Sequence, residues 1–454
     1  MHFDVIVIGT GQAAVPLATK LAKAQKRVLI VERGAPGGTC VNIGCTPTKT
    51  MIASARAAHV ARTAGRLGVH TGEVTVDFAA VVKRKDEVVR IWREGVERRI
   101  REAAPALTFL AGHARFVGER MISVDGVRHD ADIVIINAGA RPVVPKLPGL
   151  DGVPWITSTG ALGLRDLPRH LVALGGGYIG CELGQMFRRF GAEVTVVDHN
   201  PHLISREDPD ISAALEEVFR KETIGLELGV TVERVERVGD GVAVHLAGGR
   251  QVRGSHLLVA TGRRPNTDDL GCDAAGVKLD DRGFIVIDDR YQTSTKGVYA
   301  VGDVTGQPQF THVSWDDHRI LLGLLDGTSK RDRGGRAYPY TVFTDPHVAA
   351  VGLTEKEARK RGLAFQVATV PFSRVARAIE VDETAGILKV LIDPASERIL
   401  GAAIVGAEAG ELIHVFVALI QAKAPARAIV DAEFIHPTFS EGVQAVVMAL
   451  EKYA

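Results

Sequence analysis

Residues 37–49 read GGTCVNIGCTPTK, in which Cys40 and Cys45 are separated by four residues. A ring closed over so short a spacing needs a tight, preshaped backbone. A helix starting near Thr46 would supply it, with the proline that follows in its first turn. The positive end of that helix and the charge of Lys49 would favour the thiolate of Cys45. Low-pKa thiols in a small ring are typical of a reducible, catalytic disulfide rather than a structural one.

The alternatives for this pair are two ordinary buried cysteines and one half of a metal site. Zinc sites have a second pair of ligands and usually a spacing of about two to four residues. The remaining cysteines of the chain, Cys181 and Cys272, are isolated in the sequence. The sequence therefore favours a redox-active pair and predicts no resident metal. We expect Cys181 to be a small core residue.

The overall composition excludes several classes of protein. The chain has 454 residues, 46% of them hydrophobic, and a net charge of +1, so it is long enough for two to four domains. The charge balance gives no reason to expect nucleic acid or an anionic membrane surface as a partner. The first residues form a short apolar run without a basic start, and the sequence contains no apolar window of membrane-spanning length. We expect a cytoplasmic protein, where a catalytic disulfide is more plausible than a structural one.

A dinucleotide-binding fingerprint opens the chain. Residues 5–8 predict a buried parallel strand, residues 15–24 a helix, and residues 28–31 a second strand that ends at Glu32. The acid lies 23 residues after the first glycine of the turn. The fingerprint positions of that turn are Gly9, Gly11 and Ala14. Such a turn lets the backbone approach a pyrophosphate at the helix N-terminus, while the acid accepts hydrogen bonds from a ribose.

A second fingerprint follows in the middle of the chain. Residues 171–174 predict a strand, a helix runs to about Phe190, and residues 193–197 predict the next strand, which ends at Asp198. The glycines of the turn are Gly175, Gly177 and Gly180. Two complete fingerprints predict two bound dinucleotides. A carboxylate at Asp198 favours NAD(H) over NADP(H), although Arg206 further on offers a positive charge for a phosphate.

The cysteine stretch resembles the active-site disulfide of the flavoprotein disulfide reductases, the family of dihydrolipoamide dehydrogenase, glutathione reductase and mercuric reductase. The resemblance extends over nearly the whole chain, since residues 298–303 resemble the second FAD motif of the family. It implies that the first fingerprint binds FAD and the second the nicotinamide nucleotide. The residues implied for FAD are Gly9, Gly11, Ala14, Glu32, Gly38, Thr39, Lys49, Ala138, Gly139, Gly302 and Asp303. Those implied for the nicotinamide nucleotide are Gly175, Gly177, Tyr178, Gly180, Glu182, Asp198 and Gly262.

The same resemblance implies an α/β protein with two Rossmann-like dinucleotide-binding domains and an α+β C-terminal dimerisation domain. Proline-rich residues 142–154 mark a crossing between domains. We expect an FAD-binding domain in two parts, residues 1–145 and 268–335. An NAD(P)-binding domain at residues 146–267 is inserted between them, and an interface domain follows at residues 336–454. The expected assembly is a homodimer with shared active sites.

Catalytic roles also follow from the resemblance. Tyr178 would cover the flavin until the nicotinamide displaces it, and Glu182 would pair with Lys49 beside the flavin. Electrons would open the disulfide at Cys45, which would become the charge-transfer thiolate, and Cys40 would attack the substrate.

The closing motif, HPTFSE at residues 436–441, supplies the proton chemistry. A histidine with an ordinary pKa near 6.5 can both remove and return a proton at neutral pH, which makes His436 the general base. Glu441 would fix its tautomer. In the family this pair reaches the disulfide of the other subunit.

The electron acceptor is the least determined feature. Residues 309–319 are more polar and aromatic than is usual in the family, and they look closer to mercuric-reductase-like and copper-reducing members. Within them, His312 is either a hydrogen-bonded residue at a helix start or a ligand for an approaching metal. Residues 448–454 contain no second cysteine pair of the mercuric-reductase type, and those enzymes tend to have tyrosine where His436 stands.

We therefore expect an NAD(P)H-dependent flavoprotein disulfide reductase acting on a small disulfide of the lipoamide or low-molecular-weight type. The alternative is a mercuric or copper ion reductase, or an oxidant-defence reductase. A non-catalytic redox sensor or complex subunit is the third possibility, which turnover with any acceptor would exclude.

Overall fold

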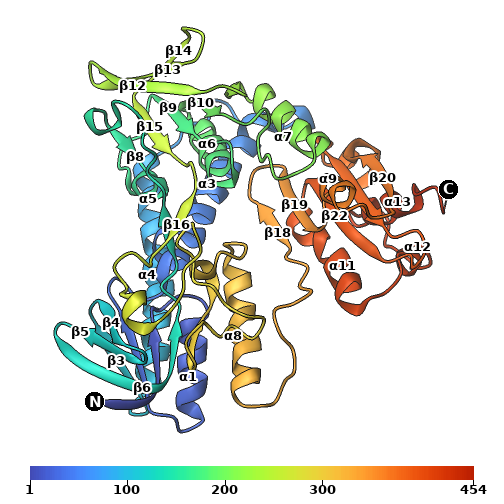
Figure 1. Cartoon of the computed structure of the whole chain (residues 1–454). Coiled ribbons are helices and arrows are strands. Elements are labelled where there is room, and N and C mark those ends of the chain that lie inside the picture. The colour runs from blue at the N-terminus through green and yellow to red at the C-terminus, as the bar shows by residue number, and fades with distance from the viewer. Residues whose placement is uncertain (454) are drawn as a thin grey trace. The chain divides into compact units, whose positions relative to one another are not determined.

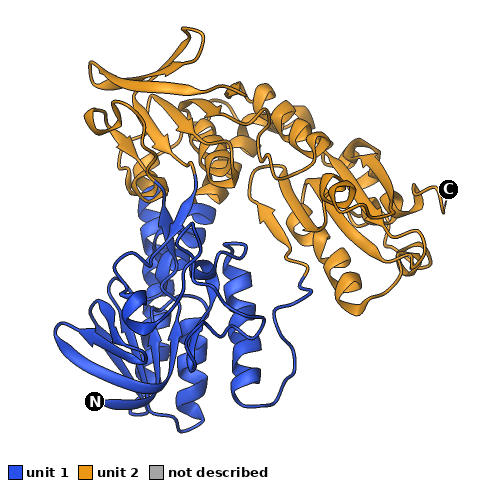
Figure 2. Cartoon of the chain, viewed as in Figure 1, with its two compact units in different colours: residues 1–50, 82–143, 262–336 blue, residues 51–81, 144–261, 337–454 orange. Residues whose placement is uncertain are grey.

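The computed structural model describes residues 1–453, whose chain contacts separate into two units (Figure 2). The chain passes between the units several times. Of the described residues, unit 1 comprises 1–50, 82–143 and 262–336, and unit 2 comprises 51–81, 144–261 and 337–453. The expected domain borders stay predictions.

Unit 1 is built on a sheet with a parallel centre (Figure 1). Its order is β3-β2-β1-β6-β5-β4, and β17 pairs with β6. The parallel strands are β1 (His2–Ile8), β2 (Val28–Glu32), β3 (Leu107–Ala111), β6 (Val127–Ile136) and β17 (Val298–Ala300). The antiparallel edge is formed by β4 (Ala114–Gly118) and β5 (Met121–Val124), and a separate pair by β7 (Ala140–Pro142) and β16 (Arg263–Pro265).

Apolar side chains bury both faces of this sheet, which explains the uninterrupted apolar run of β1. Side chains of α1 (Ala14–Lys23), α8 (Thr311–Leu325) and the end of α4 (Phe78–Glu102) pack with Val5 and Val7 on one face. On the other face, side chains of β4 and β5 pack with Phe3, Ile6 and Ile8. The packed sheet therefore fixes the carboxyl ends of the central strands, and the loops that follow these strands can present functional groups there.

Unit 2 contains a second parallel sheet of the order β11-β10-β9-β15-β8. Its strands are β8 (Trp155–Ile156), β9 (His170–Leu174), β10 (Glu193–Asp198), β11 (Gly225–Leu228) and β15 (His256–Val259). The helices of this part are α5 (Ser158–Gly163), α6 (Tyr178–Phe190) and α7 (Pro209–Lys221). An antiparallel sheet is formed by β12 (Val232–Val238), β13 (Gly241–Leu246) and β14 (Gln251–Gly254).

The C-terminal part of unit 2 is an antiparallel sheet covered by helices, of the order β18-β19-β22-β21-β20. Its strands are β18 (Tyr340–Val342), β19 (His347–Gly352), β20 (Gln366–Pro371), β21 (Ile387–Ile392) and β22 (Ile399–Gly406). The helices are α9 (Glu355–Lys360), α10 (Ala376–Glu380), α11 (Ala409–Ala422), α12 (Arg427–Val430) and α13 (Glu441–Met448). Phe372 and Phe416 are completely buried in the core between them.

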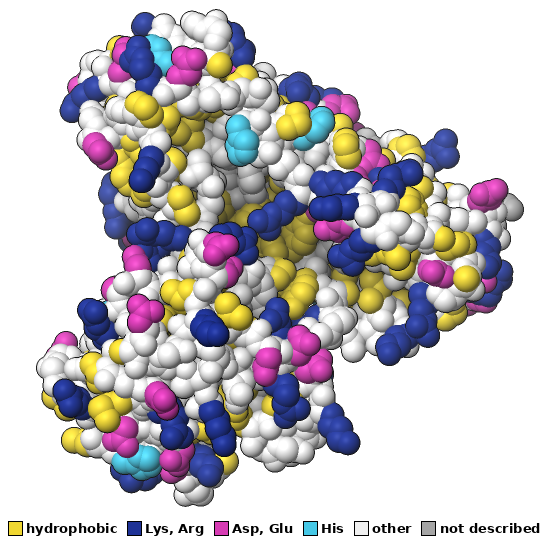
Figure 3. All heavy atoms as spheres, viewed as in Figure 1, with side chains coloured by type: hydrophobic (Ala, Val, Ile, Leu, Met, Phe, Trp, Pro, Cys, Tyr) yellow, Lys and Arg dark blue, Asp and Glu magenta, His cyan; other side chains and the backbone are white. Residues whose placement is uncertain are grey.

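This architecture confirms the predicted fold class of two Rossmann-like sheets and an α+β C-terminal part. Charged side chains of both signs are interspersed over the face shown in Figure 3, as the near-zero net charge predicts. Across residues 1–453, every helix is too short or too polar to cross a membrane.

The helix that the sequence predicts near Thr46 is confirmed as α3 (Cys45–Thr63), which begins one residue earlier. A second short helix, α2 (Gly38–Ile43), precedes it and was not predicted. Gly44 separates them, and a Cβ at this position would lie 2.9 Å from the carbonyl oxygen of Thr39. The close approach of the two helix ends therefore requires glycine and interrupts the helix.

Candidate active site

The two cysteines lie on consecutive short turns, Cys40 on α2 and Cys45 as the first residue of α3. Cys40 is half-buried and Cys45 is exposed. A hydrogen bond to Cys45, together with burial, raises the pKa of the Cys40 thiol. The sulfur atoms are therefore in contact, and Cys40 keeps its proton more strongly than an ordinary cysteine.

A third group, Thr311, completes the surroundings of the two thiols. Its Oγ1 lies 3.2 Å from the Sγ atom of Cys45 and lowers the pKa of Cys40 through a hydrogen bond. Lys49, one turn after Cys45 on α3, lowers the same pKa through its charge. Thr311 is the first residue of α8, whose N-terminus has no side-chain cap. The sequence prediction singled out the neighbouring His312 instead, whose ring stacks on Phe310 at 5.5 Å.

The first nucleotide turn is held in place by Glu32. One of its carboxylate oxygens accepts hydrogen bonds from the backbone N–H and the hydroxyl of Thr10, at 2.9 and 2.6 Å, and the other accepts from the Gly34 N–H at 2.8 Å. Gly9 has a φ of +100° and lies against the backbone of Asn137, where a Cβ would come within 2.5 Å of the carbonyl oxygen. The backbone of this turn is therefore fixed before any ligand binds.

Asn137, which the sequence prediction left without a role, links the first nucleotide turn to the end of β17. Its Oδ1 accepts a hydrogen bond from the N–H of Ala14 at 3.3 Å, and its Nδ2 donates to the carbonyl oxygen of Val301 at 2.9 Å. The adjoining Gly139 has a φ of +70°, and no atom of the described residues lies within 4 Å of a Cβ at this position. A bound nucleotide requires such open space beside the backbone. The N-terminus of α1 has no side-chain cap, so its backbone N–H groups are available to a phosphate.

The loop at Gly302 and Asp303 is supported from below by Asp317 on α8. The carboxylate of Asp317 is completely buried and accepts hydrogen bonds from the Gly302 N–H, the Tyr291 hydroxyl and Arg336, at 2.8, 2.8 and 2.6 Å. Burial raises the pKa of Asp303, an effect that Arg263, 3.9 Å away, opposes. Asp317 therefore fixes the loop that presents Asp303, and only the fold reveals this role, because nothing in the spacing of the sequence marks it.

The residues of unit 1 thus fit FAD. The uncapped α1 N-terminus, the open backbone at Gly139, the Glu32 carboxylate and the supported Asp303 form one set around the ends of β1, β2, β6 and β17.

The second nucleotide turn, in unit 2, has the same construction around Asp198. This buried carboxylate accepts a hydrogen bond from the Gly176 N–H at 2.5 Å, and from the backbone and side chain of Asn200 at 2.7 and 2.9 Å. Gly180 is required by packing, since a Cβ there would lie 1.9 Å from the carbonyl oxygen of Gly175.

Gly177 differs from these glycines. Its φ is −74°, and no atom of the described residues lies within 4 Å of a Cβ at this position. Neither conformation nor packing requires glycine here, so the close approach of a ligand to the α6 N-terminus explains it best. Tyr178 is the first residue of α6. Gly262, which belongs to unit 1, is also open, but its φ of +136° already favours glycine.

The closing histidine motif also lies in unit 2. The Nδ1 atom of His436 is 2.9 Å from a carboxylate oxygen of Glu441, and the other oxygen of Glu441 accepts the Thr438 N–H at 2.9 Å. Because a carboxylate can only accept, Nδ1 carries the proton and Nε2 is left for proton transfer. The hydrogen bond and charge of Glu441 raise the pKa of His436. The imidazole is 70% exposed, so it lies at the surface of its own unit.

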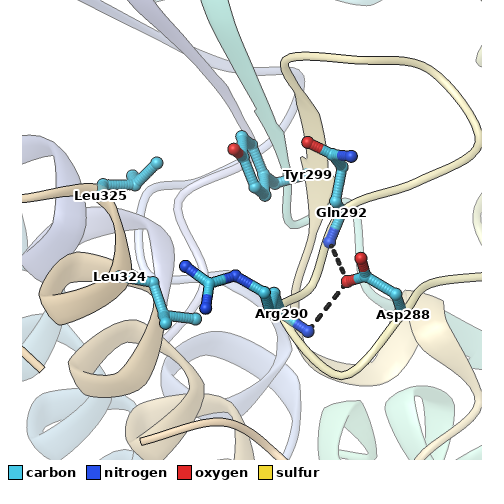
Figure 4. A pocket seen from close by; sticks show the side chains of 6 residues that line it. All are labelled: Asp288, Arg290, Gln292, Tyr299, Leu324 and Leu325. Atoms are coloured by element: carbon cyan, nitrogen blue, oxygen red, sulfur yellow. Dashed lines mark hydrogen bonds between the residues drawn. The ribbon is translucent and has the colours of Figure 1, made fainter. Parts of the chain in front are cut away.

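The structure therefore brings together Cys40, Cys45 and Lys49 in unit 1, and separately the His436–Glu441 pair in unit 2. A small hollow in unit 1 is distinct from these sites (Figure 4). None of the predicted site residues lines it, and the Asp288 carboxylate on its wall is already bonded to the backbone N–H groups of Arg290 and Gln292.

Family comparisons agree with this geometry. The family model described as pyridine nucleotide-disulphide oxidoreductase matches residues 3–317, and the model of the dimerisation domain of these proteins matches residues 338–447. The chain belongs to the pyridine nucleotide-disulphide oxidoreductase family. It is an oxidoreductase of the flavoprotein disulfide reductase kind, and family membership implies FAD and a pyridine nucleotide as its cofactors.

Several named relatives align with almost the whole chain. The probable pyridine nucleotide-disulfide oxidoreductase RclA of Escherichia coli (strain K12) is 36% identical over 97% of this chain and 98% of its own length. A mercuric reductase of Staphylococcus aureus is 34% identical over 99% of this chain and 83% of its own. A dihydrolipoyl dehydrogenase of Thermus scotoductus is 35% identical over 100% and 98%, respectively.

A solved structure of E. coli RclA, described as the Cu(II) complex of an HOCl-induced flavoprotein disulfide reductase, superposes with a TM-score of 0.90. The two chains are 35% identical, and the match covers 98% of this chain and 99% of that one.

Proposed function

We propose that this chain passes electrons from NAD(P)H, through FAD and the Cys40–Cys45 pair, to a small disulfide of the lipoamide or low-molecular-weight type. The observation that carries this proposal is the contact of the two thiols with each other and with Thr311. Bound FAD would supply the hydride acceptor that links a two-electron donor to the sulfur pair. The residues proposed to hold it are those of the first fingerprint, with Gly38, Thr39, Ala138 and the Gly302–Asp303 loop.

The sulfur chemistry follows from the different surroundings of the two cysteines. The raised pKa of Cys40 means that it needs a base before it attacks, and His436, polarised by Glu441, is the proposed base. The Cys40 thiolate would break the S–S bond of the substrate and form a mixed disulfide, while the departing sulfur takes the proton from His436. Cys45 would then attack Cys40, re-forming the internal disulfide and releasing the second thiol. Two electrons and two protons convert one disulfide into two thiols.

We further propose that the working enzyme is a homodimer, in which His436 of one subunit serves the thiols of the other. Support comes from the match to the dimerisation-domain model and from the outward-facing imidazole. The proposed pairing of Lys49 with Glu182, and the covering of the flavin by Tyr178, complete the assignment. We also propose a cytoplasmic location, where a catalytic disulfide is more plausible than a structural one.

NADH is the proposed donor. The buried Asp198 carboxylate, bonded to Gly176 and Asn200, places negative charge beside the second fingerprint, where a 2′-phosphate would be repelled.

A second candidate function is the reduction of a soft metal ion, mercuric or copper, or a related role in oxidant defence. Two thiols in contact are a suitable ligand pair for such an ion. Relatives named mercuric reductase and RclA support this alternative.

The experiment that separates the two functions is oxidation of NADH and NADPH by the purified holoenzyme. Lipoamide, glutathione disulfide, Cu(II), Hg(II) and a quinone would be tested in parallel, for the native enzyme and for Cys40→Ser. Fast turnover with one disulfide, lost in Cys40→Ser, is the expected result. Slow turnover with every disulfide and fast reduction of a metal ion would replace this proposal with the second function. A preference for NADPH would reject the role given to Asp198.

A further inference from the structure

Asp345, just after β18, contacts two helices at once. Its Oδ2 lies 2.6 Å from Nη1 of Arg189 on α6 and 3.5 Å from Nε of Arg56 on α3. Arg189 is only 6% exposed, and Glu222 holds the other edge of its guanidinium at 2.7 and 3.0 Å. Burial would raise the pKa of Asp345, but the charges of Arg189 and Arg56 outweigh burial and lower it. Asp345, Arg56 and Arg189, which we call the Asp345 ion cluster, thus form a partly buried charged link between α3 and α6.

The segment around Asp345 follows one face of α6. Gln185 accepts the Asp345 N–H and donates to the Asp345 carbonyl oxygen, both at 2.8 Å. One turn earlier, the carboxylate of Glu182 accepts the Phe343 N–H at 2.9 Å. Glu182 and Gln185 are both buried. The start of the C-terminal part of unit 2 therefore contacts α6 at successive turns, and α6 is the helix that carries Glu182.

The same two helices carry the pair that is proposed to act beside the flavin. Lys49 lies seven residues before Arg56 on α3, and Glu182 lies seven residues before Arg189 on α6. Seven residues are about two helical turns, so each residue shares a face with the arginine of its own helix. Because a helix resists sliding and rotation as a rigid element, a link at the two arginines sets the register of both helices along their length.

We propose that Asp345 is a positioning residue for the reaction: by holding Arg56 and Arg189, it sets the register of α3 and α6 that lets Lys49 pair with Glu182. Asp345 does not touch the reacting atoms and acts through these two residues. This inference rests on the proposed function, which gives the Lys49–Glu182 pair its role in reduction of the flavin.

The test is the rate of flavin reduction by NADH in the holoenzyme, measured by stopped-flow absorbance under anaerobic conditions. Asp345→Asn keeps the size of the side chain and removes its charge. We expect reduction to slow roughly tenfold, because a displacement of about 1 Å can cost about a hundredfold and a shift through a remote link should be smaller. Glu182→Gln should also slow it, and the double variant should be no slower than Glu182→Gln alone, because both changes act through one pair.

Glu383→Gln is the matched control. It removes the other carboxylate bonded to Arg56, at 2.8 Å, and leaves Asp345 in place, so its rate should equal that of the native enzyme. Arg56→Met breaks the same link from the side of α3 and should slow flavin reduction as much as Asp345→Asn does. It therefore provides a second test if Asp345→Asn folds poorly.

Three results would overturn the inference. A native rate in both Asp345→Asn and Arg56→Met would remove the positioning role. Effects that multiply in the double variant would show that Asp345 acts independently of Glu182, while leaving the proposed function intact. A native rate in Glu182→Gln would instead reject the role of the Lys49–Glu182 pair. Asp345 would then have no pair to position.

Discussion

The imidazole of His436 donates from Nδ1 to the Glu441 carboxylate at 2.9 Å, and this contact raises the pKa of the ring. A general base works only when deprotonated, so a raised pKa moves the acid limb of the pH–rate profile to higher pH. Glu441→Gln removes the charge that holds the proton, and we expect the acid limb to move to lower pH. The maximal rate should fall by about tenfold or more, because the tautomer is no longer fixed. The measurement is kcat/KM for disulfide reduction as a function of pH.

Glutamine is the suitable replacement at this position because it retains an acceptor for the Thr438 N–H, which Glu441 binds at 2.9 Å. Glu451→Gln, an exposed change in the same unit, controls for net charge and should leave the profile in place. An acid limb that is identical in Glu441→Gln and the native enzyme would contradict the role of His436.

At the scale of elements, α8 is tied through the buried carboxylate of Asp317 to the Gly302–Asp303 loop, which is proposed to hold FAD. Asp317→Asn would leave the Arg336 guanidinium, which is 9% exposed, without its principal counter-charge. Breaking such a buried pair costs about 3 kcal/mol, so we expect a lower urea midpoint and a larger loss of FAD during gel filtration. As a control, Glu87→Gln removes an ion pair with Arg90 in which both side chains are more than half exposed, and it should leave the urea midpoint almost unchanged. Equal effects of the two changes would contradict the structural role of Asp317.

Sequence periodicity was sufficient to predict α1 and α6, because each has an apolar or amphipathic pattern that directly follows a glycine turn. It was not sufficient for the break at Gly44, which depends on the approach of the Thr39 carbonyl oxygen from the preceding turn. Thr311 has the same limitation, since its contact with Cys45 joins residues 266 positions apart.

Chemically distinctive residues with a fixed spacing, such as the cysteines or His436 with Glu441, were thus accessible from the sequence. Residues that act by supporting them were not. The carboxylates of Asp317 and Asp345 acquire their roles only when the fold places arginines beside them.

At the scale of the whole molecule, the proposed proton donor and the redox thiols belong to different units, and the histidine faces outward beside Ile435, which is 78% exposed. If each active site combines Cys40 of one subunit with His436 of the other, two inactive variants should complement each other. Cys40→Ser and His436→Ala homodimers should both lack disulfide reductase activity. After the subunits are exchanged at a 1:1 ratio, half of the dimers are hybrids with one intact site of two, so we expect about a quarter of the native activity.

A reciprocal mixture makes this prediction decisive. Native enzyme exchanged with the double variant, Cys40→Ser with His436→Ala, should retain about a quarter of the native activity, because both sites of every hybrid dimer then lack one group. If the thiols and the histidine of one chain form a site together, the first mixture stays inactive and the second retains about a half. The two mixtures contain the same substitutions in the same amounts and differ only in which chain carries them. Poor folding of a variant lowers the number of hybrid dimers but cannot create activity in the first mixture, so activity there shows that catalysis crosses from one subunit to the other.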